Sequence, residues 1–288
     1  MFAVLQDVVD GYNYVFYELA CPISRDWILV GKPFHLMCIM IPYLYFCTRL
    51  GPRLMKHQAP FNVTKLMMVH NLFQIFLSIY IFEEALRYIL FHNFDFNCQG
   101  LSSDPAVAKW VARGVWIFYM AKLSELLDTV FFVLRKSNRQ ISSLHLHHHT
   151  LMPISAWFGA TYFPGGQGIL VGFFNAIVHT VMYTYYLIAG FGDEYKKYLW
   201  WKKYVTILQI IQFLIIGVHA VKSLFYSCDY FVTFKILTIF YCSFFTYTFG
   251  KFYYVNYIKK AKTVNGVESS PKKQNKLSND SQITKKSK

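Results

Sequence analysis

The most informative residues in this chain are histidines that lie close together in one short segment. In the segment 145–149, the side chains of His145, His148 and His149 fall on one face of a helix, and His147 points away from it. Facing imidazoles can ligate a metal ion such as iron, or one can act as a nucleophile while another acts as a general base. Such a cluster has no simple structural explanation, so it is the strongest functional signal in the sequence.

Three further segments carry polar side chains at helical spacing. Lys122 and Glu125 on their own could form a buried ion pair that holds helices together, and tyrosine or glutamine stripes often make hydrogen bonds between membrane helices. The remaining histidines His35, His57, His70, His92 and His219 are isolated, and we interpret them as structural. The three sets are Lys122, Glu125, Asp128 and Thr129; Asn175, His179, Met182, Tyr183 and Tyr186; and Thr206, Gln209 and Gln212.

The composition indicates that these segments belong to membrane helices. Of 288 residues, 55% are hydrophobic and 15% are charged, whereas a soluble domain carries about 25% charged residues. This excludes a disordered chain, a coiled coil and a small disulfide scaffold. We predict an all-α polytopic membrane protein with seven transmembrane helices, each near the ~20 residues that a span needs. The spans are expected at residues 27–47, 66–88, 114–134, 145–163, 168–188, 204–221 and 231–250.

Charge in the loops predicts the orientation. The first, third and fifth loops are rich in lysine and arginine, and such loops face the cytosol. We therefore expect a lumenal N-terminal segment at 1–26, a transmembrane domain at 27–258 and a disordered basic cytosolic tail at 259–288. The tail contributes half of the net charge of +14, so the positive charge does not form a nucleic-acid-binding face. We therefore expect the lipid bilayer, and no nucleic acid, as a partner.

The polar sets converge at one depth. Glu125 lies ten residues before Arg135, His148 nine after Arg139, and Gln209 six after Lys203. At about 1.5 Å per residue, these groups lie roughly 10–20 Å inside the cytosolic boundary. Four helices therefore place polar side chains in one slab, which predicts a buried site that opens to the cytosol.

Other residues exclude some chemistry and suggest a crosslink. The histidines are too few for the several histidine boxes of a di-iron desaturase or hydroxylase, and no serine nucleophile motif or phosphate-binding glycine loop is present. We expect no metal and no cofactor. Cys98 and Cys228 are the two cysteines in predicted non-cytosolic loops, where they could form a disulfide or remain unrelated thiols.

The polar sets resemble the motifs of one enzyme family. Residues 122–129 resemble the KxxExxDT motif of very-long-chain fatty acid elongases, which are the 3-ketoacyl-CoA synthases of the endoplasmic reticulum membrane. Residues 145–149 resemble their HxxHH box, 175–186 their NxxxHxxMYxYY motif and 206–212 their TxxQxxQ motif, in the family's order. His147 stands where an aromatic residue is common, which we interpret as a tolerated substitution. The terminal Lys285 and Lys286 are similar to the KKxx retrieval signal of that membrane.

The resemblance implies a reaction and roles for the residues. Acyl-CoA and malonyl-CoA would condense to a 3-ketoacyl-CoA two carbons longer, with release of CO2 and CoA. His148 would accept the acyl group, with His179 as its acid–base partner, His145 and His149 as orienting groups and Asn175 as a donor. The remaining residues of the four motifs would support the site or position the thioester.

The substrates suggest further features. The acyl tail needs an apolar channel within the bundle, and Arg139, Lys202 and Lys203 could pair with the phosphates of CoA, although such cations also signal topology. Other enzymes of the elongation cycle are expected partners. The alternatives are a membrane di-iron desaturase or hydroxylase, and a non-enzymatic seven-helix receptor or transporter.

Overall fold

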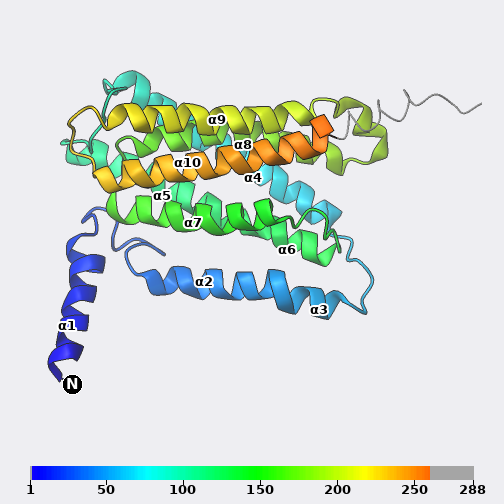
Figure 1. The fold of residues 1–288 in the computed structure, drawn as a ribbon, viewed down its shortest axis with the longest axis horizontal. Coiled ribbons are helices and arrows are strands. Elements are labelled where there is room, and N and C mark those ends of the chain that lie inside the picture. The colour runs from blue at the N-terminus through cyan, green and yellow to red at the C-terminus, as the bar shows by residue number, and fades with distance from the viewer. Residues whose placement is uncertain (1, 260–288) are drawn as a thin grey trace, which may run out of the picture.

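The computed structural model describes residues 2–259, and this part of the chain consists of helices and their connections (Figure 1). All the longer helices run side by side in one bundle, except the N-terminal helix α1, which crosses their direction at one end (Figure 1). The helices are α1 (Phe2–Asn13), α2 (Pro33–Tyr45), α3 (Gly51–Met55), α4 (Thr64–Phe91), α5 (Pro105–Ser124), α6 (Leu126–Leu134), α7 (Ser143–Tyr162), α8 (Gly168–Gly190), α9 (Lys202–Ser223) and α10 (Val232–Tyr253). Short π-helical segments at Tyr14–Glu18, Phe46–Leu50 and Tyr254–Lys259 extend α1, α2 and α10.

Five helical segments of the described chain are long and apolar enough to cross a membrane. They are Pro33–Met55, Thr64–Phe91, Gly168–Gly190, Lys202–Ser223 and Val232–Lys259. The predicted third and fourth spans correspond to α5 with α6 and to α7, which are helical but do not meet this standard because they carry the charged and histidine-rich motifs. The structure therefore supports a multi-pass membrane protein, while the count of seven crossings and their orientation stay predictions.

Four predicted span boundaries were wrong by six residues or more. Two of them are the ends of the first and seventh spans, which continue to Met55 and Lys259 instead of stopping at residues 47 and 250. The first span begins at Pro33, six residues later than expected, since proline is favoured in the first turn of a helix. The third begins at Pro105, nine residues earlier, because the Asp104 carboxylate accepts hydrogen bonds from the backbone N–H groups of Ala106 and Val107 and caps the helix. It is also interrupted at Glu125, where α5 ends and α6 follows.

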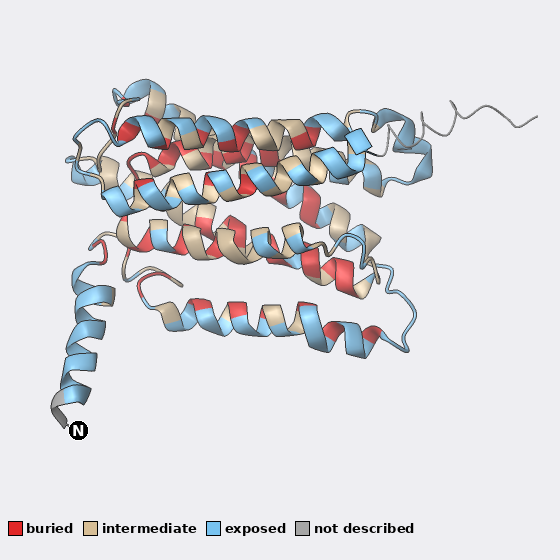
Figure 2. Cartoon of the chain, viewed as in Figure 1, coloured by how far each residue is buried: buried red, intermediate tan, exposed pale blue. Residues whose placement is uncertain are grey.

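The outer surface of the bundle is apolar, and polar side chains lie inside it. Phe73 and Phe76 on α4, Val218 on α9 and Phe240 on α10 are exposed, which is the pattern of helices that face lipid. Buried residues follow the inner faces of the helices (Figure 2). The interior accordingly offers the place where ionisable groups can be shielded from hydrocarbon.

The loops sort into two sets at opposite ends of the bundle. The loops before α4, before α7 and before α9, which carry the lysine and arginine clusters, lie at one end with the last turn of the described chain (Figure 1). The loops before α5, α8 and α10 lie at the other end, near α1 (Figure 1). The predicted tail beyond residue 259, with Lys285 and Lys286, falls outside the described residues.

A close approach between helices holds α6 in place. Gly51 at the start of α3 faces Val133 of α6 so closely that a Cβ atom there would lie 2.6 Å from the Val133 Cγ1 atom. Glycine is therefore required for this contact. Because α6 carries Asp128 and Thr129, the contact helps to fix the register of the polar residues described below.

A disulfide joins the two loops at the end near α1. Cys98, between α4 and α5, is bonded to Cys228, between α9 and α10, with their Cα atoms 5.6 Å apart. The buried ammonium group of Lys235 donates hydrogen bonds to the Cys98 sulfur at 3.1 Å and to the Ser223 carbonyl oxygen at 2.8 Å. The bond thus ties the α4–α5 pair to the α9–α10 pair across this end.

We expect the double variant Cys98→Ser/Cys228→Ser to be less stable than the parent by about 2–4 kcal/mol, because the disulfide restricts the unfolded chain across a long loop. The measurement is the thermal midpoint of the purified protein in detergent. Cys38→Ser, which removes an exposed free cysteine, is the control and should leave the midpoint unchanged. An equal midpoint for parent and double variant would contradict this prediction.

Candidate active site

The centre of the bundle contains a buried polar cluster contributed by α5, α8 and the junction between α5 and α6. The ammonium nitrogen of Lys122 lies 2.6 Å from Glu125 Oε1 and 2.7 Å from Asn175 Oδ1. Nδ1 of His179 lies 3.0 Å from the same Glu125 oxygen. One carboxylate therefore bridges a lysine on α5 and a histidine on α8.

This cluster is shielded from solvent. The exposed fractions of Lys122, Glu125, Asn175 and His179 are 2%, 3%, 3% and 5%. An isolated charge in such surroundings is costly, and the cost is offset only when opposite charge and hydrogen-bond donors are held in contact. The Lys122 ammonium group also lies 4.8 Å from the centre of the Phe118 ring, a cation–π contact.

A second cluster lies around Asp128 in the first turn of α6. The hydroxyl of Tyr183 on α8 donates to Asp128 Oδ2 at 2.8 Å. The Nε2 atom of His70 on α4 lies 3.2 Å from the other carboxylate oxygen. Asp128 therefore lies between α4 and α8, with a hydrogen bond to Tyr183 and an ion-pair distance to His70, whose Nε2 atom makes no hydrogen bond among the described residues.

The histidine face of α7 lies next to Thr129. The Thr129 hydroxyl is 2.9 Å from His145 Nε2 and 2.7 Å from the hydroxyl of Tyr43 on α2. The rings of His145 and His149 are 4.2 Å apart, and those of His148 and His149 are 5.4 Å apart. The prediction that these three histidines share a face is confirmed.

His147 lies off that face, as predicted. Its side chain is exposed, and Nδ1 contacts the carbonyl oxygen of Ser143 one turn earlier at 2.6 Å. Among the described residues it does not contact the other imidazoles of this helix, so it offers a natural control position.

Short α6 brings the clusters together. Only four residues separate Glu125 from Thr129, and Asp128 lies between them. The contacts that these three residues make with other helices are therefore spread over only about 6 Å along the helix axis. Through these three residues the Lys122 cluster, the His70–Tyr183 pair and the histidine face of α7 become one continuous polar site.

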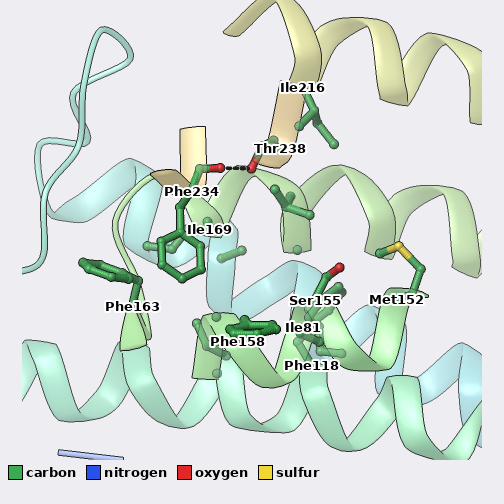
Figure 3. Close-up of a pocket in the computed structure, with 18 of the residues that line it drawn as sticks. Ile81, Phe118, Met152, Ser155, Phe158, Phe163, Ile169, Ile216, Phe234 and Thr238 are labelled. Carbon is green, nitrogen blue, oxygen red and sulfur yellow. Dashed lines mark hydrogen bonds between the residues drawn. The ribbon is translucent and has the colours of Figure 1, made fainter. Parts of the chain in front are cut away.

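An apolar cavity of about 350 Å³ lies between the helices, and two of the rings that line it also contact residues of the site (Figure 3). Near the site its wall includes Gln212, Phe118 and Phe245. The Phe118 ring contacts the Lys122 ammonium group, and the centre of the Phe245 ring is 5.2 Å from that of His148. Further along, side chains such as Phe158, Phe163, Ile169 and Phe234 line it (Figure 3). The reactive groups are thus placed beside a space suited to a hydrocarbon chain.

Comparison with known proteins identifies the family. The model of the ELO family, described as the GNS1/SUR4 family, matches residues 28–265. This chain belongs to the very long chain fatty acid elongase family. A very long chain fatty acid elongase of Aedes aegypti is 37% identical over 88% of this chain and 72% of its own length. Very long chain fatty acid elongase 1 of Homo sapiens is 36% identical over 88% of this chain and 92% of its own length.

Family membership supports a role in very-long-chain fatty acid elongation. Very long chain fatty acid elongase 7 of Rattus norvegicus is similarly related, with 38% identity over 83% of this chain and 86% of its own length. The membership does not support the iron-enzyme, receptor and transporter alternatives. Within residues 2–259 no group of three or more His, Cys, Asp or Glu side chains could hold a metal ion.

The remaining motif residues lie around the site at different distances. Gln209 Nε2 is 3.5 Å from the Met182 sulfur, which links α9 to α8. Thr206 and Gln212 are buried on α9, and Gln212 Oε1 has no hydrogen-bond partner among the described residues. Tyr186 is 40% exposed and touches the site only through a ring contact with Tyr183.

The three cations proposed for CoA binding in the elongase lie apart from the buried cluster. Arg139 lies in the loop before α7, and Lys202 and Lys203 begin α9; all three side chains are exposed. Both segments are at the end of the bundle where the histidine face begins (Figure 1). Their position is compatible with an anionic group that approaches the site from that end.

Sequence reasoning missed the contribution of α4. His70 was interpreted as isolated and structural, and that interpretation was wrong about its isolation, because its ring contacts Asp128, Phe131 and Tyr183. A signal was present: His70, Gln74 and Ser78 are buried and spaced four residues apart on one face. Gln74 also reaches the site region, since its amide donates to the Ser124 hydroxyl at 2.8 Å.

We expect Lys122→Met to lower the stability of this elongase by about 3–5 kcal/mol, because it leaves the Glu125 carboxylate buried without its cation. Adding Glu125→Gln should recover part of the loss, since the second change removes the unpaired charge. Thermal midpoints of the purified variants provide the measurement. Lys196→Met, which breaks the exposed ion pair with Asp193, is the matched control and should have little effect. A Lys122→Met midpoint equal to that of the control would refute the prediction.

Proposed function

We propose that this elongase is the condensing enzyme of fatty acid elongation, a very-long-chain 3-oxoacyl-CoA synthase of the endoplasmic reticulum membrane. It joins a long-chain acyl-CoA with malonyl-CoA to give a 3-ketoacyl-CoA two carbons longer, with CO2 and CoA as the other products. The observation that carries the proposal is the contact between the histidine face and the apolar cavity, through His148 and Phe245. No cofactor beyond the two CoA substrates takes part.

The first half-reaction transfers the acyl group to His148. An imidazole nitrogen of His148 attacks the thioester carbon, the new C–N bond forms and the C–S bond breaks. The CoA sulfur leaves with the pair of electrons from the broken bond. It takes up the proton lost from the imidazole, which gives the CoA thiol. His149 and His145, in ring contact with one another, orient the nucleophile and accept or relay this proton.

The second half-reaction forms the carbon–carbon bond. The bond between the carboxylate and the methylene carbon of malonyl-CoA breaks, and CO2 leaves. The resulting enolate carbon attacks the acyl carbon, and the C–N bond to His148 breaks. The ring nitrogen leaves with the pair of electrons and takes up one proton from solvent, which restores the imidazole. The Asn175 amide and His179 each lie within hydrogen-bonding distance of the Lys122 ammonium group, and we assign to these three groups the stabilisation of the enolate oxygen.

The remaining parts of the substrates are bound at the two ends of the site. The apolar cavity holds the acyl tail, which removes its hydrocarbon from water. Arg139, Lys202 and Lys203 pair with the CoA phosphates. The 3-keto product then passes to the reducing and dehydrating enzymes of the same cycle, which are the proposed partners.

Substitution of the proposed nucleophile provides the direct test. Purified protein should extend long-chain acyl-CoA by two carbons only when malonyl-CoA is present, and His148→Ala should reduce the rate on the order of 10³-fold. His147→Ala is the matched control on the same helix and should keep the parent rate. Without malonyl-CoA, the parent should gain the mass of one acyl group, and His148→Ala should gain none. Well-folded parent protein that forms no 3-keto product across a panel of long acyl chains would disprove the function.

A separate variant tests the part played by α4. His70→Phe should lower kcat about 10-fold with little change in KM for acyl-CoA, because Asp128 loses one of its two partners and Tyr183 shifts from its position beside His179. His70→Gln keeps an N–H donor and should restore most of kcat. His57→Phe, at an exposed position, is the control. Equal kcat values for His70→Phe and His70→Gln would contradict a positioning role for His70.

A further inference from the structure

The N-terminal helix α1 has one apolar and one polar face. Within Phe2–Asn13, five apolar side chains recur at intervals of three or four residues and share one face. The opposite face carries the acidic and amide groups, where Gln6 Nε2 donates to Asp10 Oδ1 at 3.0 Å. The apolar residues are Val4, Leu5, Val8, Val9 and Tyr12, and all are exposed, with Val8 at 62%.

This helix has a defined direction. It runs across the bundle helices at the end where α2 begins and α7 ends (Figure 1). The segment that follows it is fixed to α7: the Cys21 backbone N–H donates to the Thr161 carbonyl oxygen at 2.8 Å. Arg25 adds a hydrogen bond to the Tyr17 carbonyl oxygen and stacks on the Tyr17 ring at 4.0 Å.

One end of the apolar face is anchored to the bundle, and the rest of it is exposed. Tyr12 contacts Phe16, with ring centres 4.9 Å apart, and Phe16 is half-buried against Trp157 on α7. The stripe of Leu5, Val9 and Tyr12 leads into this contact. In a bundle whose helices cross a membrane, a helix that runs across them at one end lies along the membrane surface, where an exposed apolar face can enter the hydrocarbon (Figure 1).

We propose that α1 lies in the plane of the bilayer surface and inserts its apolar face at the boundary between headgroups and hydrocarbon, at the end of the bundle opposite the polar site. The lipids that it fits are zwitterionic, because the described part of α1 contains Asp7 and Asp10 and no lysine or arginine. Apolar burial rather than attraction to anionic lipid therefore holds it there. This inference depends on the membrane setting and not on the proposed condensing reaction.

The test places nitroxide spin labels on opposite faces of α1 in the full chain. Val8→Cys and Asp10→Cys are labelled in a Cys38→Ser background, which removes the exposed free cysteine and leaves Cys21, Cys47 and Cys242 buried. The proteins are placed in phosphatidylcholine nanodiscs, and collision of each label with oxygen and with a water-soluble nickel chelate is measured. Leu5→Cys and Asp7→Cys form a second pair, so one poorly folded variant does not decide the result.

We expect the Val8 label to lie about 5–10 Å below the lipid phosphates and the Asp10 label at or above them. Labels on both faces that collide freely with the nickel chelate would overturn the proposal, because α1 would then stand in water. A Val8 label shielded from both reagents, with dipolar coupling between labels in one disc, would also overturn it by showing that a second copy of this chain covers the face.

Discussion

The bridge that Glu125 makes between Lys122 and His179 is the interaction on which the site depends. In the interior of a membrane bundle, neither an ammonium group nor a carboxylate can be solvated by water, so each must be compensated by a partner at close range. The 2.6 Å and 3.0 Å contacts provide that compensation. They also join α5 to α8, because moving one of these helices away from the other would leave a buried charged group without one of its partners.

The junction between α5 and α6 distributes this constraint over the whole bundle. Glu125 contacts α8, Asp128 contacts α4, and Thr129 contacts both α7 and α2. A straight amphipathic helix could direct polar groups only along one stripe. The interruption at Glu125 and the short α6 allow Glu125, Asp128 and Thr129 to face several neighbouring helices. The contact of Gly51 with Val133 limits how far α6 can move.

The contrast between this polar site and the adjoining cavity accounts for the chemistry that we propose. Charged and hydrogen-bonding groups in surroundings of low dielectric are effective in stabilising developing charge, provided that they are already oriented. The rings of Phe118 and Phe245 line the apolar cavity and contact Lys122 and His148, respectively. A hydrocarbon tail in that cavity would keep water from the reacting thioester and leave the polar groups to act on it.

The sequence by itself determined which residues share a helix face, because the 3.6-residue repeat is a local property. It predicted the histidine face of α7, the outward position of His147 and the apolar spans, and its motifs indicated the family. It did not determine that His70 contacts Asp128, 58 residues further along, that the third span breaks at Glu125, or which side chains line the apolar channel that the resemblance implied. These depend on which helices become neighbours, and packing between distant segments, not local periodicity, decides that. The direction of α1 was decided in the same way, by the contacts of Phe16 and Cys21 with α7.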